Sequence, residues 1–351
     1  MRLISAASCR KEEWPVNRQL VFLIPVIVII TFWLMARYEA KVAKDSASRS
    51  FVQRNGLALS IFFVGAVAFW TLFLVVLPYL YMMQESFHPT LWPKDRGGPK
   101  DVLTLEHYKF FIYGVQSGAE ASYNVTHIKA FFLTILISMA VTLINLVLCY
   151  PIAYYMAQVA TAQKVRLLML ALILPYWVNE VLRAFALRIL LASEGIINRF
   201  LQFIGLTSGP VDFLALDVGL FTGLSYAYLL IMVFPLYNAI ESLDKNQIEA
   251  ARDLGAPWWR IHKEVVIPYA KPGIASGCTM VFMLSAGALA APQFLGGPST
   301  LWFTSIVYDF FFQSFNWARG SAYALILLVG CILLVMLLLR SFKVSLGEAI
   351  K

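Results

Sequence analysis

Long apolar runs separated by short polar segments dominate the chain, and they predict helices that cross a membrane. A spanning α-helix needs about 20 predominantly apolar residues. Pro151 interrupts the second run, which a membrane helix tolerates, and Pro175 interrupts the third together with charged residues. The pattern predicts an all-α polytopic membrane helical bundle with six core spans: Leu57–Met83, Ala130–Val159, Leu167–Leu191, Leu216–Ile240, Val265–Leu289 and Ala322–Leu339.

A further apolar stretch, Gln19–Ala36, lies between Arg18 and Arg37 near the N-terminus. It predicts an extra transmembrane helix before the six core spans. A helix lying in the membrane interface is one alternative. A cleaved signal peptide is the other, but no small-residue cleavage site follows the stretch. We therefore expect an uncleaved helix here.

The composition agrees with a membrane protein and excludes several other classes. The chain has 351 residues, of which 60% are hydrophobic and 14% charged, whereas soluble domains are about 25% charged. A soluble enzyme, a disordered scaffold and a secreted disulfide-rich module are therefore excluded. Three of the four cysteines lie in apolar runs and none forms a Cys-x-x-Cys pair, so we expect neither a metal site nor a disulfide framework. The Phe, Trp and Met residues at helical spacing indicate packing or lipid contact, so no cofactor is expected.

The distribution of basic residues predicts the orientation in the membrane. The net charge is +8, but lysines and arginines flank the apolar runs, which indicates topology rather than binding to nucleic acid. The segments 37–54, 163–166, 241–264 and the tail from residue 340 carry five, two, four and three basic residues. The segments 84–129, 192–215 and 290–321 carry five, one and one. The positive-inside rule therefore places the first set and the C-terminus in the cytoplasm, although a spanning N-terminal helix would put its own four basic residues outside.

The segment 241–268, between the fourth and fifth core spans, differs from a simple connector. Ile248, Ala251 and Leu254 recur at three-residue spacing and predict an amphipathic helix over Asn246–Leu254 with these side chains on one apolar face. Gly255 stands where a helix end requires a left-handed residue, and Pro257 suits the start of the next helix. A helix–turn–helix on the cytoplasmic surface is expected, and a membrane-surface hairpin without a partner is the alternative.

This segment resembles the signature loop of the membrane subunits of binding-protein-dependent ABC importers. That loop reads Glu-Ala-Ala, three residues, Gly, nine residues, Ile-x-Leu-Pro. Here Val265 and Ile267 replace the Ile and Leu, and the other positions match. The residues that carry the resemblance are Glu249, Ala250, Ala251, Gly255, Val265, Ile267 and Pro268.

The resemblance implies that the loop couples the chain to ATP-hydrolysing subunits. It divides the chain into an N-terminal extension, residues 1–54, and an importer permease domain, residues 55–345, whose coupling loop is 241–268. The implied partners are ATP-binding-cassette ATPase subunits, a second similar permease, a periplasmic substrate-binding protein and the lipid bilayer of the bacterial inner membrane. The chain itself has no Gly-x-x-x-x-Gly-Lys-Ser/Thr loop, so we expect no ATPase activity of its own.

Other stretches resemble the spermidine/putrescine branch of this family, which implies a polyamine substrate. The resemblance covers roughly residues 57–340. Related permeases for sulfate, molybdate, iron or phosphonates share much of the scaffold, and these substrates stay open. The stretches are Pro175-Tyr176-Trp177, Gly195-Ile196-Ile197-Asn198, Pro235-Leu236-Tyr237, Ser242-Leu243-Asp244-Lys245, Gly296-Gly297-Pro298 and Phe315-Asn316-Trp317.

Candidate substrate-pathway residues follow from their position and chemistry. An ionisable residue at membrane depth is expensive and suggests function, and ammonium groups bind carboxylates and aromatic faces. Tyr176, Trp177, Glu180 and Asp309 therefore suit a polyamine. Arg183 stands three residues after Glu180, close enough to pair with it, and a structural ion pair is as good an interpretation as a substrate contact. Arg183 and Arg188 would also suit an anion.

Two functions of other classes compete with the importer. An ion-coupled secondary transporter would use buried carboxylates and broken helices, often in repeated halves, but the two halves of the core show no clear self-similarity. A purely structural membrane subunit is the second alternative. Neither explains the loop at 241–268.

Overall fold

The computed structural model describes residues 57–91, 98, 101–114, 123–297 and 300–342, and the regular elements within them are all helical. The stretch Gln19–Ala36 lies outside the described residues. The chain forms two compact units, residues 1–84 and 85–351.

The first unit contributes one long apolar helix. It runs without interruption through α3 (Leu57–Thr71), a π-helical turn η1 (Leu72–Val76) and α4 (Leu77–Ser86). Residues Ser60–Ser86 are long and apolar enough to cross a membrane, which confirms the first expected span. Its large apolar side chains are mostly exposed, and Phe62, for example, is 69% exposed. An apolar helix with so much exposed surface needs lipid or another protein around it.

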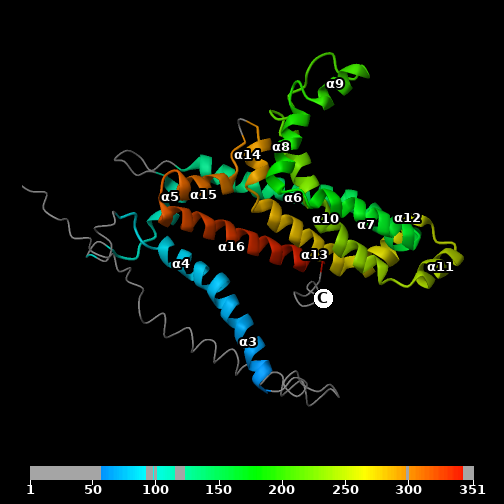
Figure 1. The fold of residues 1–351 in the computed structure, drawn as a ribbon, viewed down its shortest axis with the longest axis horizontal. Helices are drawn as coiled ribbons and strands as arrows, with labels where there is room; N and C mark the ends of the chain where they lie inside the picture. The colour runs from blue at the N-terminus through cyan, green and yellow to red at the C-terminus, as the bar shows by residue number, and fades with distance from the viewer. Residues whose placement is uncertain (1–56, 92–97, 99–100, 115–122, 298–299, 343–351) are drawn as a thin grey trace, which may run out of the picture. The chain divides into compact units, whose positions relative to one another are not determined.

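Three helices form the centre of the second unit (Figure 1). These are α6 (Val125–Tyr154), α10 (Val218–Glu241) and α13 (Ile267–Ala286), which pack against one another. Gly273 and Gly277 on α13 allow α10 to approach closely. A Cβ atom at Gly273 would collide with Ala239 and the Pro235 carbonyl, and one at Gly277 would lie 2.8 Å from Met232 Sδ. Small residues four apart are a common device for packing helices in membranes.

Four further spans confirm the sequence prediction, with shifted ends. They are Val125–Val159, Val218–Glu241, Trp258–Ala286 and Trp317–Phe342. Pro151 lies inside α6, which continues into the π-helix η2 (Tyr155–Val159). The fifth core span starts seven residues earlier than expected, because α12 (Trp258–Ile261) passes through the π-helix η3 (His262–Val266) into α13.

The third expected span, Leu167–Leu191, is not one straight helix. It consists of α7 (Ala162–Tyr176) and α8 (Glu180–Leu191), which continues toward α9 (Ile196–Phe203), and the two parts are bent by 89°. Pro175 lacks the backbone N–H that would bond to the carbonyl of Ala171, which weakens the last turn of α7. The side chain of Asn179 accepts a hydrogen bond from Val181 N at 2.8 Å and caps the new helix. The interruption expected at Pro175 is present, and the structure shows that it divides the span with a sharp bend.

Short helices complete the second unit. One end of it carries α11 (Lys245–Asp253) and α12, and we call this the loop end (Figure 1). Away from it lie α5 (Glu106–Tyr113), α14 (Ala290–Leu295) and α15 (Phe303–Phe312), and the last helix, α16 (Trp317–Phe342), begins beside α5 and α15.

Candidate coupling loop and substrate pathway

The loop 241–268 folds as the sequence predicts around Gly255. Asp244 caps α11 by accepting a hydrogen bond from Asn246 N at 3.0 Å. Gly255 has φ +76°, its N–H donates to Arg252 O at 2.8 Å, and Ala256 N donates to Ala251 O at 3.1 Å. These two bonds form a Schellman motif, which ends a helix with a left-handed residue. The turn therefore reverses the chain sharply between α11 and α12.

One side chain of the expected apolar face lies elsewhere. Ile248 is buried and Ala251 is half-buried, but Leu254 is 88% exposed. Leu254 is the C-cap residue, where the chain leaves the helical path, so the three-residue spacing no longer places it on the same face. Together with exposed Trp258 and Trp259 it leaves an apolar surface at the tip of the loop.

The other residues of the signature are mostly accessible. Glu249 and Ala250 are exposed on α11, while Ile267 and Pro268 are exposed where α13 begins. Val265 is half-buried. An exposed carboxylate beside an exposed apolar tip provides the mixture of contacts that a protein partner can use.

Polar contacts attach both ends of this loop to the core helices. Gln158 Nε2 donates to Ile240 O at 2.7 Å, and Tyr269 Oη donates to Ser242 O at 2.9 Å. On the other side of the loop, Tyr150 Oη and His262 Nδ1 lie 2.7 Å apart. Because α6, η2 and α13 hold the loop at each end, a displacement of the loop must move these helices as well.

The break between α7 and α8 brings together several of the expected pathway residues. Glu180 begins α8 and accepts a hydrogen bond from Tyr228 Oη at 3.2 Å. The Arg183 guanidinium lies 5.2 Å from the ring centroid of Tyr176 and 5.8 Å from that of Tyr226. Glu180 and Arg183 form no ion pair with each other, so of the two interpretations of their spacing the structural ion pair is wrong.

Two tyrosines of this cluster were missed from the sequence. Tyr226 and Tyr228 lie near the middle of α10, in a run of apolar residues. The only signal was a pair of phenols separated by one residue in a membrane span, and nothing in the pattern indicates which helix they face. We call Tyr176, Glu180, Arg183, Tyr226 and Tyr228 the break cluster.

The two remaining candidates lie apart from these contacts. Trp177 sits in the break itself and is 82% exposed, so it is accessible but makes no ring contact with the cluster. Asp309 is exposed on α15, which packs against α16 and α6, whereas α8 packs against α14 and α10. Asp309 therefore belongs to a different part of the bundle from Glu180.

A cavity of about 480 Å³ opens near the C-terminal end of α8. Arg188 and Asp212 line it together with Leu214, Phe294 and Gly296. Asp212 Oδ1 accepts hydrogen bonds from Leu214 N and Ala215 N, so this carboxylate stabilises its own turn. Arg188 thus faces an open cavity, whereas Arg183 packs against aromatic rings.

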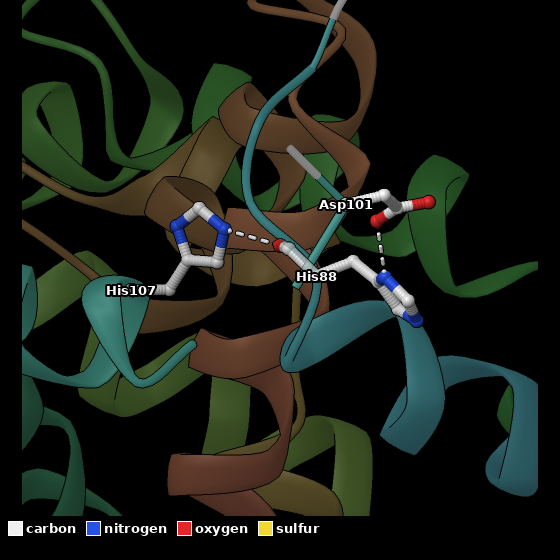
Figure 2. A network of polar contacts seen from close by, with 3 residues as sticks. All are labelled: His88, Asp101 and His107. Atoms are coloured by element: carbon white, nitrogen blue, oxygen red, sulfur yellow. Dashed lines mark hydrogen bonds and ion pairs between the residues drawn. The ribbon is translucent and has the colours of Figure 1, made fainter. Parts of the chain in front are cut away.

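A polar network orders the segment that leads into α5 (Figure 2). His88 lies between the other two residues: its Nδ1 donates to Asp101 Oδ1 at 2.6 Å, and its carbonyl accepts from His107 Nε2 at 2.9 Å. His107 is fully buried and its Nδ1 has no partner. Burial lowers the pKa of His107 from its usual 6.5, and nearby Arg319 lowers it further, against a smaller raising effect of the bond to His88.

Comparison with known protein families agrees with this geometry. Residues 139–343 match the model of the family described as binding-protein-dependent transport system inner membrane component. That match covers more than half of the chain, including the loop and the break cluster. The chain belongs to this family. It is a membrane permease subunit of an ABC importer, as its resemblance to that family implied.

Similar proteins cover most of the chain. The spermidine/putrescine transport system permease protein PotB of Haemophilus influenzae is 30% identical over 281 residues, which are 80% of this chain and 93% of that protein. PotB of Escherichia coli is 32% identical over 269 residues, 76% of this chain and 92% of that protein. A crystal structure of a bacterial ABC transporter involved in the import of the acidic polysaccharide alginate aligns with TM-score 0.61 and 18% identity, covering 86% of this chain and 98% of that one. At this identity the alignment shows a shared fold.

Proposed function

We propose that this importer permease carries polyamines of the spermidine and putrescine class into the cell. The supporting observation is the similarity to the PotB proteins, which extends over more than nine-tenths of the length of those relatives. The break cluster supports the same substrate, since it brings a carboxylate close to several aromatic faces. Ammonium groups bind to both kinds of surface.

The loop 241–268 is proposed to dock on a separate ATPase subunit. Glu249, Ala250, Ala251 and Gly255 shape the part that meets the partner, and Val265, Ile267 and Pro268 lead back into the bundle. In this proposal the protein pairs with a second, similar permease, two copies of the ATPase and a periplasmic binding protein. The loop and the C-terminus lie in the cytoplasm, as the distribution of basic residues predicts.

A rigid-body movement connects ATP binding to substrate passage in this scheme. When the ATPases close on ATP, they pull on the loop, and its attachments at Gln158 and His262 pass the movement to η2 and α6. The pore then opens outward, and the binding protein delivers the substrate. Hydrolysis returns the pathway to the inward-facing state.

The substrate pathway is proposed to pass the break between α7 and α8. Charged side chains at this depth are costly in lipid and normally face a protein interior or an aqueous cavity. Glu180 and Tyr176 are the proposed contacts for the substrate cation, with Trp177 accessible beside them. Asp309 on α15 would meet the substrate at a separate position, away from the break.

Uptake in cells tests the substrate. Cells lacking their own polyamine importers express this chain with its second permease, ATPase and binding protein, and radiolabelled spermidine and putrescine are offered with sulfate and molybdate as competitors. Saturable polyamine uptake that stops with an inactive ATPase is the expected result. Uptake of an anion instead would reject the polyamine assignment, and uptake that follows an ion gradient without the ATPase would indicate a secondary transporter.

A further inference from the structure

Arg183 occupies the aromatic surface on which a substrate cation would be expected to bind. Its guanidinium lies over the rings of Tyr176 and Tyr226, at 5.2 and 5.8 Å from their centroids. Both tyrosines are about two-fifths exposed, so they are accessible from outside the chain. A cation over the face of a tyrosine is attracted by the ring, most strongly where water is excluded.

Glu180, one turn away, is left free to accept a second cation. Arg183 stands three residues further along the same helix, yet the carboxylate is held by Tyr228 at 3.2 Å and not by the guanidinium. A carboxylate has about four acceptor positions, and the phenol uses one of them. Glu180 thus retains capacity for the N–H groups of an ammonium ion.

The guanidinium itself is incompletely satisfied. Arg183 Nε is buried and has no hydrogen-bond partner. A buried donor without an acceptor is unfavourable, so hydrogen bonding does not fix the Arg183 side chain in this position. A small movement of the side chain would uncover both tyrosine rings.

We propose that the Arg183 guanidinium occupies the substrate cation site in the empty protein and moves out of this site when a polyamine binds. This inference rests on the proposed polyamine function. In the empty state Arg183 covers the two rings and balances the charge of Glu180 without pairing with it. An arriving ammonium group takes the ring faces and binds Glu180, and Arg183 swings aside. Arg183 therefore competes with substrate and does not attract it.

Direct binding to the assembled membrane complex tests this proposal. The complex of this chain, its second permease and its ATPase is placed in lipid nanodiscs without the binding protein, and equilibrium binding of radiolabelled spermidine is measured. Arg183→Met removes the competing charge and keeps the side-chain length, so we expect spermidine to bind on the order of tenfold more tightly. Arg183→Lys keeps a cation and should bind as the wild type does.

Matched variants separate competition from a general change in charge. Arg199 on α9 is exposed and lies outside the break cluster, and Arg199→Met should leave spermidine binding unchanged. Adding Glu180→Gln to Arg183→Met should abolish the gain. If Arg183→Met does not assemble, Arg183→Gln replaces it with the same expected gain. Unchanged or weaker binding by the assembled Arg183 variant, or a gain that survives Glu180→Gln, overturns the proposal.

The uptake assay distinguishes failure of this inference from failure of the proposed function. If the wild-type system takes up spermidine while Arg183→Met binds it no more tightly, only the role of Arg183 is wrong. If wild-type cells take up an anion and none of the assembled variants binds spermidine, the polyamine function is wrong, and this inference is rejected with it.

Discussion

Polar side chains inside this protein are held by a few hydrogen bonds to nearby helices and connecting segments. Tyr228 holds Glu180, Tyr150 meets His262, and the Asn198 side chain bonds to the backbone at Ala192 and Val211. Each such bond contributes only about 0.5–1.5 kcal/mol net, but a buried partner left alone costs more. A single side chain can therefore change its protonation or its hydrogen bonds without unfolding the protein. Protonation of His107 is an example that can be measured.

Acidification should destabilise the protein through His107. Its pKa in the folded state is lowered from 6.5 because burial disfavours the charged ring. Below this pH the unfolded chain binds more protons than the folded protein does. The contribution of neutral His107 to the free energy of unfolding is therefore complete above about pH 6.5 and is lost as the pH falls below it. The measurement is the thermal unfolding midpoint of the detergent-solubilised complex at pH 8 and pH 5.5.

The control for this effect is His107→Gln, which can still donate to the His88 carbonyl but cannot titrate. We expect the variant to lose less of its unfolding temperature between the two pH values than the wild type. Equal losses in the two proteins would show that His107 does not contribute to the pH dependence.

The sequence could predict the chemistry of the break cluster but not its full membership. Glu180 and Arg183 stand out because charges in an apolar run are rare. Tyr226 and Tyr228 were missed because their role depends on α10 packing against α8, a contact between distant parts of the chain. The same contact between α10 and α8 gives Glu180 its hydrogen bond from Tyr228, which the sequence spacing could not indicate.

At the scale of elements, the sequence predicted the turns that depend on a few adjacent residues, but it did not predict where a helix bends. The turn at Gly255 depends on a few adjacent residues and formed as expected. The sequence shows Pro175 and charged residues in the third span, but it does not show that one helix ends at Tyr176 and another begins at Glu180 after the Asn179 cap. Hydropathy measures whether a segment tolerates lipid, but it does not detect a bend.

Replacing Gly255 with Val should abolish transport while leaving membrane insertion intact. The residue has φ +76°, and an added Cβ would meet nothing within 4 Å, so the penalty comes from the backbone alone and not from crowding. A β-branched residue strongly disfavours this conformation. ATP-dependent uptake and the amount of protein in the membrane fraction are the two measurements.

Gly255→Asn is the matched control, because asparagine tolerates the left-handed region. It should retain much of the uptake that Gly255→Val loses. Normal uptake by the valine variant would reject the role of this turn in coupling.

At the scale of the whole molecule, the proposed orientation places the loop end in the cytoplasm. Leu254 at the tip of the loop and Phe203 at the end of α9 are 88% and 89% exposed, which makes them equivalent reporters. The described native cysteines, Cys149, Cys278 and Cys331, are buried. They should therefore react little with a labelling reagent.

Cysteine labelling should confirm this topology. A membrane-impermeant maleimide added to intact spheroplasts without the ATPase subunit should label Phe203→Cys but not Leu254→Cys. After permeabilisation both variants should react. The opposite pattern in intact spheroplasts would invert the proposed orientation and place the loop outside the cell.

The break between α7 and α8 has an electrostatic consequence that does not depend on any ionisable side chain. A helix carries partial negative charge at its C-terminus and partial positive charge at its N-terminus. Because α7 ends at Tyr176 and α8 starts at Glu180 with an 89° change of direction, the two dipoles do not cancel as they would in a continuous helix. The carbonyl end of α7 therefore presents a fixed negative potential beside Tyr176, and this potential acts on the Arg183 guanidinium and on a substrate cation alike.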